Sequence, residues 1–484
     1  MNPSSYASLP ERFFARVAPT AVAGPRLVKL NHALADELDL SETGLDAGGL
    51  AGMFSGNALP PGAMPIAMAY AGHQFGHFVP QLGDGRAILL GEMRDHAGVR
   101  RDIQLKGCGR TPYSRSGDGR AALGPVLREF LVSEAMHALG IPTTRSLAAV
   151  TTGETVRRDT IVPGAVLTRI AASHVRVGTF EYFAARGDVA AVKILADYVI
   201  ERHFPHLAEN KTPYLALLAE VVSRQASLIA AWMHVGFIHG VMNTDNMAVS
   251  GETIDFGPCA FLDAFDPAAV FSSIDERGRY AYGNQPHAGA WNLARFAETL
   301  LPIIDPNPAR AIELATEVVS TFNALFADRW LAGMRRKLGL ATDEEGDRAL
   351  VDDLLHAMHS NQADFTLTFR GLCEAAEQRE PRPAVFGAAR DYDDWVPRWH
   401  ARLARESTLP TARAETMRRI NPAYIPRNHR IEQLIDAAIQ QGDFGPFEAF
   451  LAVLSQPCRD QARFAAYADP PGPSERVLQT FCGT

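Results

Sequence analysis

The stretch from Gly236 to Pro258 limits what this chain can fold into more than any other feature of the sequence. It reads G-F-I-H-G-V-M-N-T-D-N-M-A-V-S-G-E-T-I-D-F-G-P, with a His-Gly pair, an Asp-Asn pair and an Asp-Phe-Gly tripeptide in that order. The spacing predicts two loops joined by a short hairpin, with strands at 247–249 and 253–254 and the turn at 250–252. Hard oxygen ligands at the mouths of these loops would suit Mg²⁺.

Three residues of this stretch, His239, Asn246 and Asp255, follow the order of the protein-kinase signature H-R-D-x-x-x-x-N and D-F-G. Val241 occupies the position two residues after the histidine, where the kinase base belongs. Asp245 is the only carboxylate between Val241 and Asn246, so it is the candidate that replaces this base. The alternative is structural, with His239 as a packed loop histidine and Asp245 as a turn former. The ordered set favours a metal site at Asn246 and Asp255.

The length and composition indicate a soluble protein of several parts. A chain of 484 residues predicts two or three domains or lobes. The formal charge of -8 argues against a nucleic-acid-binding protein. No apolar run reaches the roughly 18 residues of a membrane span, and the N-terminus shows no secretory signal or transit peptide. We therefore expect a cytoplasmic protein with no membrane or nucleic-acid partner.

A glycine-rich turn lies in the region of strands and tight turns that the sequence predicts from residue 64 to residue 150. Gly83 and Gly85 flank an aspartate and predict a hairpin turn before a strand at 87–90. The backbone N–H groups of such a turn suit phosphate oxygens, and Arg86 adds a cation beside it. Ordinary hairpin chemistry explains the same glycines.

Lys106 falls on the polar face of a strand predicted over 102–106. An amphipathic helix predicted over 123–139 carries Glu129, which could pair with Lys106 and hold the lysine extended. Glu134 on another face of that helix is the competing partner. For a lysine on an isolated strand and a glutamate on a helix, the simpler expectation is exposure to solvent.

Several arginines suggest a site for a multiply charged anion. The loop at 107–121 carries three arginines among glycines. Arg169 and Arg176 can converge on one polyphosphate only if the chain bends between them. Further helices are predicted at 188–204, 214–235 and 293–301, with a loop at 280–292. From residue 309 onward the pattern is almost wholly helical. A turn-rich insert at 421–429 interrupts it and could approach the cleft between the lobes, where the site is expected.

Taken together, these stretches resemble the SelO family, pseudokinases that act as protein adenylyltransferases. The resemblance runs nearly end to end and is most specific in Y-A-G-H-Q-F-G-H-F-V-P-Q-L-G-D-G-R (70–86), Q-L-K-G-C-G-R-T-P-Y-S-R-S-G-D-G-R-A (104–121) and H-G-V-M-N-T-D-N-M (239–247). It implies a kinase-like fold that binds ATP in a flipped orientation. AMP would then pass to Ser, Thr or Tyr hydroxyls of protein substrates while pyrophosphate leaves, with Mg²⁺, or Mn²⁺ in its place, as the cofactor.

The resemblance also implies a role for each matching residue. Lys106 and Glu129 would form the lysine–glutamate pair, and Arg169 and Arg176 would hold the inverted nucleotide. Asp245 would accept the proton of the acceptor hydroxyl. The remaining contacts comprise the metal ligands Asn246 and Asp255 and the nucleotide contacts Gly83, Gly85, Arg86, Asp118 and Gly119.

The implied fold class is α+β, a protein-kinase-like two-lobe fold with extensions at both ends. We expect an N-terminal extension at 1–63 that wraps the small lobe, an N-lobe at 64–168, a C-lobe with the metal site at 169–307, and a helical region at 308–484. A monomer is favoured over an oligomer.

Two other functions remain open from the sequence. A γ-phosphotransferase of the small-molecule-kinase type normally has H-G-D, so Val241 argues against it. A non-catalytic nucleotide-binding pseudokinase would not need Asp245, Asn246 and Asp255 together.

The cysteines differ from the pattern of some family members, which pair a selenocysteine or cysteine near the C-terminus with a cysteine shortly after the metal site. Residues 264–275 contain no cysteine here. Cys259 is the nearest candidate partner for Cys482, and whether the two meet is left open.

Overall fold

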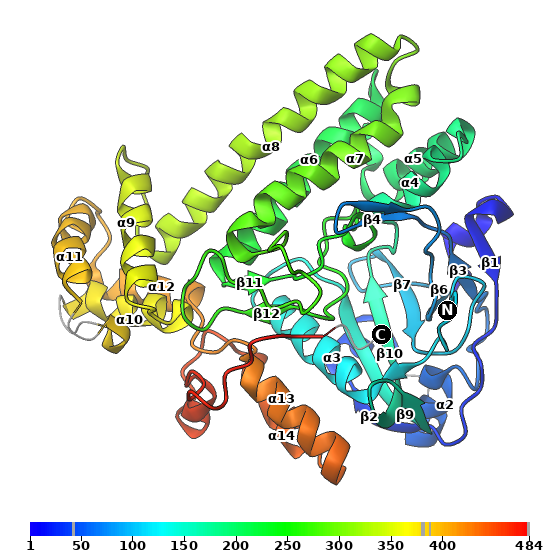
Figure 1. Cartoon of the computed structure of the whole chain (residues 1–484), viewed down its shortest axis with the longest axis horizontal. Helices are drawn as coiled ribbons and strands as arrows, with labels where there is room; N and C mark the ends of the chain where they lie inside the picture. The colour runs from blue at the N-terminus through cyan, green and yellow to red at the C-terminus, as the bar shows by residue number, and fades with distance from the viewer. Residues whose placement is uncertain (41–43, 379–382, 387–388, 482–484) are drawn as a thin grey trace.

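One antiparallel sheet takes up most of the first third of the chain, and helices take up most of the rest (Figure 1). This computed structural model describes residues 1–40, 44–378, 383–386 and 389–481. The sheet runs in the order β1-β3-β6-β7-β10-β9-β2, and β8 pairs with β10. Its strands are β1 (Phe14–Arg16), β2 (Arg26–Leu30), β3 (Ile66–Met68), β6 (Ala87–Arg94), β7 (Arg100–Lys106), β8 (Ala121–Ala122), β9 (Arg145–Arg157) and β10 (Ile161–Ala171). The expected α+β class is confirmed.

The N-terminal segment contributes structure to this sheet. Its strands β1 and β2 form the two ends of the strand order, next to β3 and β9 respectively. The short helix predicted after residue 31 is α1 (His32–Glu37), and Asn31 caps it by accepting a hydrogen bond from the backbone N–H of Leu34. A second helix, α2 (Ala47–Ser55), buries Phe54 in the same cluster as apolar residues of β9. The segment therefore completes the sheet.

Helix α3 (Leu123–Ala138) crosses the sheet and confirms the amphipathic helix expected there. Its apolar stripe, including Leu127, Phe130 and Leu131, is fully buried in the main core. Gly140 follows the helix in the left-handed region, with a φ of 74°, and so ends it in the way that the sequence predicts.

A two-stranded hairpin lies outside the main sheet, formed by β4 (Gly72–Gln74) and β5 (His77–Val79). Phe75 and Gly76 make its two-residue tip, with φ values of 50° and 86°. Positive φ at both tip residues matches the twist of the strands, but it is uncommon for phenylalanine. The prediction of a hairpin turn at Gly83 and Gly85 is wrong. The hairpin in this part of the chain turns at Phe75-Gly76 instead.

The helices after the sheet bury many of the remaining apolar residues of the main core (Figure 1). Within this helical part, helix α6 packs against α7 and α8, which run beside it. Its helices are α4 (Val177–Ala184), α5 (Val189–His203), α6 (Pro213–His234), α7 (Gln285–Ile304), α8 (Pro308–Lys337), α9 (Asp347–Ser360), α10 (Phe365–Gln378), α11 (Arg390–Leu403), α12 (Pro410–Ile420), α13 (Asn428–Asp436) and α14 (Gly445–Leu454). Length and composition alone would let α6 cross a membrane, but 56% of its most apolar window is buried inside the protein.

Two predictions about loops in this part fail. The loop expected at 280–292 ends early, because α7 begins at Gln285 and places Pro286 in its first turn, where a missing N–H costs nothing. The two strands expected at 247–249 and 253–254 do not pair with each other. Ala248 pairs with Arg176 and Thr253 pairs with Thr143, so partners distant in sequence replace the local hairpin. The turn itself is present, with the N–H of Gly251 donating to the carbonyl of Ala248.

Two other segments frame the loops that carry the site. Strands β11 (Phe237–Ile238) and β12 (Ala260–Phe261) pair on either side of them. The insert expected at 421–429 is buried, and the guanidinium of Arg427 lies 2.6 Å from carboxylate oxygens of both Asp263 and Asp364.

Candidate functional site

Lys106, at the end of β7, is the centre of a buried group of ionic side chains. Its ammonium Nζ lies 2.6 Å from Oε2 of Glu129 on α3 and 2.7 Å from Oδ1 of Asp255. Arg169 on β10 donates from Nε to Oε1 of Glu129 at 3.0 Å. The expected Lys106–Glu129 pair is therefore present, whereas Glu134 binds Arg145. We call Lys106, Glu129, Arg169 and Asp255 the ionic cluster.

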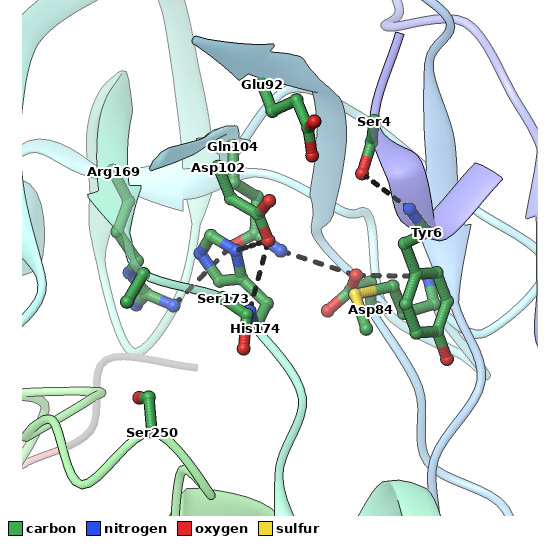
Figure 2. Close-up of polar contacts among 12 residues, drawn as sticks. Ser4, Tyr6, Asp84, Glu92, Asp102, Gln104, Arg169, Ser173, His174 and Ser250 are labelled. Atoms are coloured by element: carbon green, nitrogen blue, oxygen red, sulfur yellow. Dashed lines mark hydrogen bonds and ion pairs between the residues drawn. The ribbon is translucent and has the colours of Figure 1, made fainter. Parts of the chain in front are cut away.

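The polar face of β7 explains why these side chains meet. Asp102, Gln104 and Lys106 alternate with apolar residues, and all three polar side chains are buried. Figure 2 shows Gln104 between Arg169 and Asp84, and Asp102 beside His174. The simpler expectation, that Lys106 is exposed to solvent, is therefore wrong.

The cations of the ionic cluster keep its carboxylates ionised. Burial acts to raise the pKa of Glu129, but Arg169 and Lys106 outweigh it and hold that pKa below its ordinary value. Burial likewise opposes the shift at Asp255, where Lys106, Arg169 and Arg86 together lower the pKa strongly. Two buried cations thus face the buried carboxylate of Glu129 and the partly exposed carboxylate of Asp255.

Asp255 also has an unusual backbone conformation. Its φ of 70° lies in the left-handed region, which costs free energy for a residue other than glycine. The ammonium of Lys106 donates to Oδ1 of this carboxylate, and none of the described residues donates a hydrogen bond to Oδ2. A quarter of this side chain, 24%, is exposed.

Asn246 and Asp255 carry oxygen donors of the kind that a divalent cation binds, and their role as ligands stays a prediction. The amide Nδ2 of Asn246 donates to the carbonyl of Val241 at 3.0 Å, which fixes the amide and leaves Oδ1 as an acceptor. Within the described part of the chain, no three His, Cys, Asp or Glu side chains gather as a metal site. A single carboxylate with an amide oxygen suits Mg²⁺, which keeps several waters and takes further ligands from phosphates.

Asp245 lies in quite different surroundings. The residue is buried, with 8% of its surface exposed. Gln74 donates from Nε2 to Oδ2 at 3.3 Å, while Oδ1 has no hydrogen-bond partner among the described residues. Burial raises the pKa of Asp245 to about 7, although the guanidinium of Arg176 acts in the opposite direction.

The two arginines expected to act together lie on different sides of the site. Arg169 belongs to the ionic cluster, whereas Arg176 donates from Nη1 to the backbone carbonyl of Asp245 at 3.1 Å. The guanidinium of Arg176 also lies over the ring of Tyr70, 4.5 Å from its centroid. Strand β10 ends at Ala171, between the two arginines, and their convergence on one polyphosphate stays a prediction.

The glycine-rich turn packs against the loop that follows β7. A Cβ on Gly83 would overlap the ring of Tyr113, and a Cβ on Gly85 would lie 2.8 Å from the carbonyl oxygen of Tyr113. Thr111 closes this contact by donating from Oγ1 to the carbonyl of Asp84 at 2.6 Å. The glycines are needed for this close approach of two loops.

Asp118 and Gly119 are not joined to the ionic cluster by any contact of the described residues. Asp118 is half-exposed and pairs with Arg158 at 2.8 Å. Gly119, with a φ of 70°, packs against the backbone of Gly109. In this structure they shape the loop, and a role in nucleotide binding stays a prediction.

The C-terminal tail reaches the segment after Asp255 (Figure 1). Thr480 donates from Oγ1 to the carbonyl of Pro258 at 2.6 Å and pairs with Ser272. Cys259 is buried, which raises the pKa of its thiol to about 12. Cys482 lies outside the described residues, so its pairing with Cys259 stays open.

Sequence reasoning assigns no role to two polar side chains around this site, Gln104 and Gln74. Gln104 links Arg169 to Asp84, and Gln74 holds Asp245. The signal for Gln104 was its place on the polar face of β7. For Gln74 the signal was a pair of polar residues between two glycines, G-H-Q-F-G.

Comparisons with known proteins show which family this chain belongs to. The model of the family described as protein adenylyltransferase SelO matches residues 2–455. The chain is 62% identical over 484 residues to a protein nucleotidyltransferase YdiU of Rhizobium rhizogenes, covering 99% of this chain and 96% of the relative. It is 61% identical to a protein of the same name from Rhizobium meliloti, with 99% of each chain covered. A further relative of that name, from a Bradyrhizobium species, is 62% identical over 483 residues.

Proposed function

Because this chain belongs to the family of protein adenylyltransferase SelO, we propose that it transfers AMP from ATP to Ser, Thr or Tyr hydroxyls of proteins. The curated relatives bear the name protein nucleotidyltransferase, which supports a nucleotide as donor and a protein as acceptor. The sheet and the helical part would then correspond to the two lobes of a kinase-like fold, with boundaries near residues 63, 168 and 307.

One observation carries this proposal. The carboxylates of Asp245 and Asp255 lie close enough to affect each other electrostatically, yet only Asp255 is paired with cations. A group-transfer site needs fixed positive charge for the phosphates and a separate acceptor for the proton of the attacking hydroxyl. Lys106 and Arg169 would supply the first, and Asp245 the second. Val241 excludes a base at the conventional kinase position.

The two cations of the ionic cluster, Lys106 and Arg169, would bind the phosphates of ATP. Lys106 and Arg169 are extended and charged because Glu129 holds both, so their N–H groups need little reorganisation when a polyphosphate enters. Arg86 would add a third cation, since it acts on the same Asp255 carboxylate. Arg176, Gly83, Gly85, Asp118 and Gly119 complete the proposed nucleotide contacts.

Asp245 would accept the proton in the transfer step. The acceptor oxygen forms a bond to the α-phosphorus, and the bond from that phosphorus to the bridging oxygen of the β-phosphate breaks. Pyrophosphate leaves with the bonding electron pair, and the hydroxyl proton goes to the carboxylate of Asp245. Asn246 and Asp255 would hold Mg²⁺, which when bound neutralises charge on the phosphates.

A paired labelling experiment tests the proposal. The purified chain is incubated with Mg²⁺ and with ATP labelled at either the α- or the γ-phosphate, and protein-bound label is counted. Label from α-labelled ATP alone is the expected result, and chelation of the metal should abolish it. Label from γ-labelled ATP alone would contradict the proposal and indicate a phosphotransferase. Binding of ATP with no label and no pyrophosphate release would indicate a non-catalytic nucleotide-binding protein.

A parallel reaction compares the donors and the metals. Mn²⁺ replaces Mg²⁺ at equal concentration, and UTP replaces ATP. The oxygen ligands Asn246 and Asp255 suit both cations, so we expect turnover with either metal.

A further inference from the structure

The hairpin β4–β5 is tied to the loop that carries Asp245. The backbone N–H of His73 donates to Oγ1 of Thr244 at 2.7 Å, and the backbone N–H of Phe75 donates to Oδ1 of Asn243 at 3.0 Å. Between them, the side chain of Gln74 donates to Oδ2 of Asp245 at 3.3 Å. Three consecutive hairpin residues therefore bind three consecutive loop residues.

Two glycines allow this close approach. A Cβ on Gly72 would overlap Oδ1 of Asp245 and would lie 2.9 Å from the Cβ of the same residue. A Cβ on Gly178, at the start of α4, would overlap the carbonyl oxygen of Ala71, which enters the hairpin. The N–H of Ala71 in turn donates to the carbonyl of Gly178 at 2.9 Å. The base of the hairpin is thereby fixed beside Asp245.

A buried glutamate anchors the hairpin and the loop together. Glu181 on α4 is only 4% exposed, and its carboxylate lies 2.5 Å from Nδ1 of His73 and 2.5 Å from Oγ1 of Thr244. A charge-assisted hydrogen bond in a buried place is stronger than one in water. This carboxylate therefore links a side chain of the hairpin to a side chain of the loop that carries Asp245.

The tip of the hairpin stores strain that these contacts maintain. Phe75 has a φ of 50°, in the left-handed region that is unfavourable for a residue other than glycine. Its ring packs against Tyr280, whose hydroxyl donates to Asn243 at 2.8 Å. Such conformations persist where the surroundings fix them, which is common at functional sites.

We propose that Gln74 is a positioning residue for Asp245, and that the hairpin β4–β5 sets the place where the acceptor hydroxyl meets that carboxylate. This inference rests on the proposed function, because it assigns a role in the same transfer step. Gln74 restrains one oxygen of a carboxylate whose other oxygen has no partner. Without this amide, a buried and unpaired carboxylate has no group to define its rotamer on the hairpin side.

The assignment separates Gln74 from the residues that bind the nucleotide. In the described structure its side chain makes no hydrogen bond to the ionic cluster, and its only such contact at the site is with Asp245. Loss of the amide should therefore lower kcat while it leaves the affinity for Mg²⁺-ATP unchanged. A misplaced catalytic group typically costs up to about 10²-fold in rate.

The test uses two variants of the full chain, Gln74→Met and Gln74→Glu. The first keeps the length of the side chain and removes the donor, and the second replaces the donor with a carboxylate that repels Asp245. His77→Ala is the matched control, because His77 pairs with Gln74 through the backbone of the same hairpin and its side chain is exposed. Self-labelling from α-labelled ATP and pyrophosphate release give kcat and KM, and calorimetry gives the Mg²⁺-ATP affinity.

We expect kcat to fall in the order wild type, Met variant, Glu variant, with a loss of about 10-fold or more for the Met variant and unchanged ATP affinity and Tm. Equal kcat in wild type and both variants would overturn the inference. A higher kcat in either variant would also overturn it, because it would mean that the amide of Gln74 blocks the carboxylate of Asp245. Equal losses in both variants and in His77→Ala would indicate a structural role and would also overturn it. If the wild type itself transfers no AMP, the proposed function fails instead.

Discussion

Two carboxylates of one loop segment, Asp255 and Asp245, have opposite surroundings in this molecule. The carboxylate of Asp255 lies 2.7 Å from the ammonium of Lys106 and 4.0 Å from the guanidinium of Arg169. The carboxylate of Asp245 accepts one hydrogen bond, from the neutral amide of Gln74. The guanidinium of Arg176 donates to the backbone carbonyl of Asp245 and not to the side chain.

The difference shows how the surroundings of two aspartates in one fold suit them to two different chemical roles. A carboxylate beside two cations stays ionised and suits a metal or phosphate site. A carboxylate without a cation has a free oxygen for a proton or a hydroxyl. Each surrounding comes from a different part of the chain, since the sheet supplies the cations at Asp255 and the hairpin β4–β5 covers Asp245. Substitutions on each side should therefore separate nucleotide binding from transfer.

We call the surroundings of Asp255, with their cations, the charged side of the site, and the surroundings of Asp245 the uncharged side. The largest effect is expected at the charged side, from Asp255→Ala. This change removes a proposed metal ligand and leaves Lys106 with Glu129 alone. Transfer should fall by about 10³-fold or more, because the charge on the phosphates is no longer neutralised. Titration calorimetry should show no Mg²⁺-dependent binding of ATP. Asp159→Ala, at an exposed aspartate, is the control, and unchanged Mg²⁺-dependent binding in Asp255→Ala would exclude the ligand role.

The next largest effect is expected at the uncharged side, from Asp245→Asn. The amide keeps the shape of the side chain but cannot accept the proton. Removal of a general base typically lowers kcat by about 10²–10⁴-fold, and ATP affinity should be retained because the ionic cluster is intact. Single-turnover labelling from α-labelled ATP measures the rate. A variant that transfers AMP at a near-normal rate would rule out Asp245 as the proton acceptor.

A smaller effect is expected from Lys106→Met, which weakens the charged side without removing it. Arg169 still pairs with Glu129, so one of the two cations remains. Transfer should fall by about 10²-fold, with a higher KM for ATP. Lys193→Met is the control, because Lys193 lies on the surface and pairs with the exposed Asp197. Equal rates in Lys106→Met and wild type would mean that the lysine serves only to pair carboxylates.

The sequence predicted the charged side of this comparison better than the uncharged side. Regular periodicity places Lys106 on the polar face of β7 and Glu129 on α3, and both elements formed close to their expected bounds. Two long regular elements that pack on each other bring such residues together without special geometry.

The uncharged side depends on local geometry and distant contacts that periodicity does not encode. The tip of the hairpin carries phenylalanine in a conformation that favours glycine or asparagine, so the turn signal was weak. The bond from Gln74 to Asp245 joins residues far apart in the chain, and no pattern of spacing predicts it. The same reason explains the failed hairpin after Asn246, because Ala248 and Thr253 found partners on other segments.

The smallest effect is expected from Thr480→Val, which tests whether the C-terminal tail supports one side only. The hydroxyl of Thr480 is buried and donates to the carbonyl of Pro258, close after Asp255 in the chain. Loss of one buried hydrogen bond should lower the free energy of unfolding by about 1 kcal/mol. Because Pro258 follows the loop that we propose binds the metal, the Mg²⁺-ATP affinity should fall by less than about tenfold, and the transfer rate at saturating ATP should not change.

Thr416→Val is the control for this variant, since the hydroxyl of Thr416 is exposed and bonds only within its own helix. Urea unfolding and calorimetry measure the two quantities. A fall in kcat at saturating ATP would contradict the expectation, because it would mean that the tail also acts on Asp245. The tail would then couple the two carboxylates, and their opposite surroundings could no longer be treated as independent of each other.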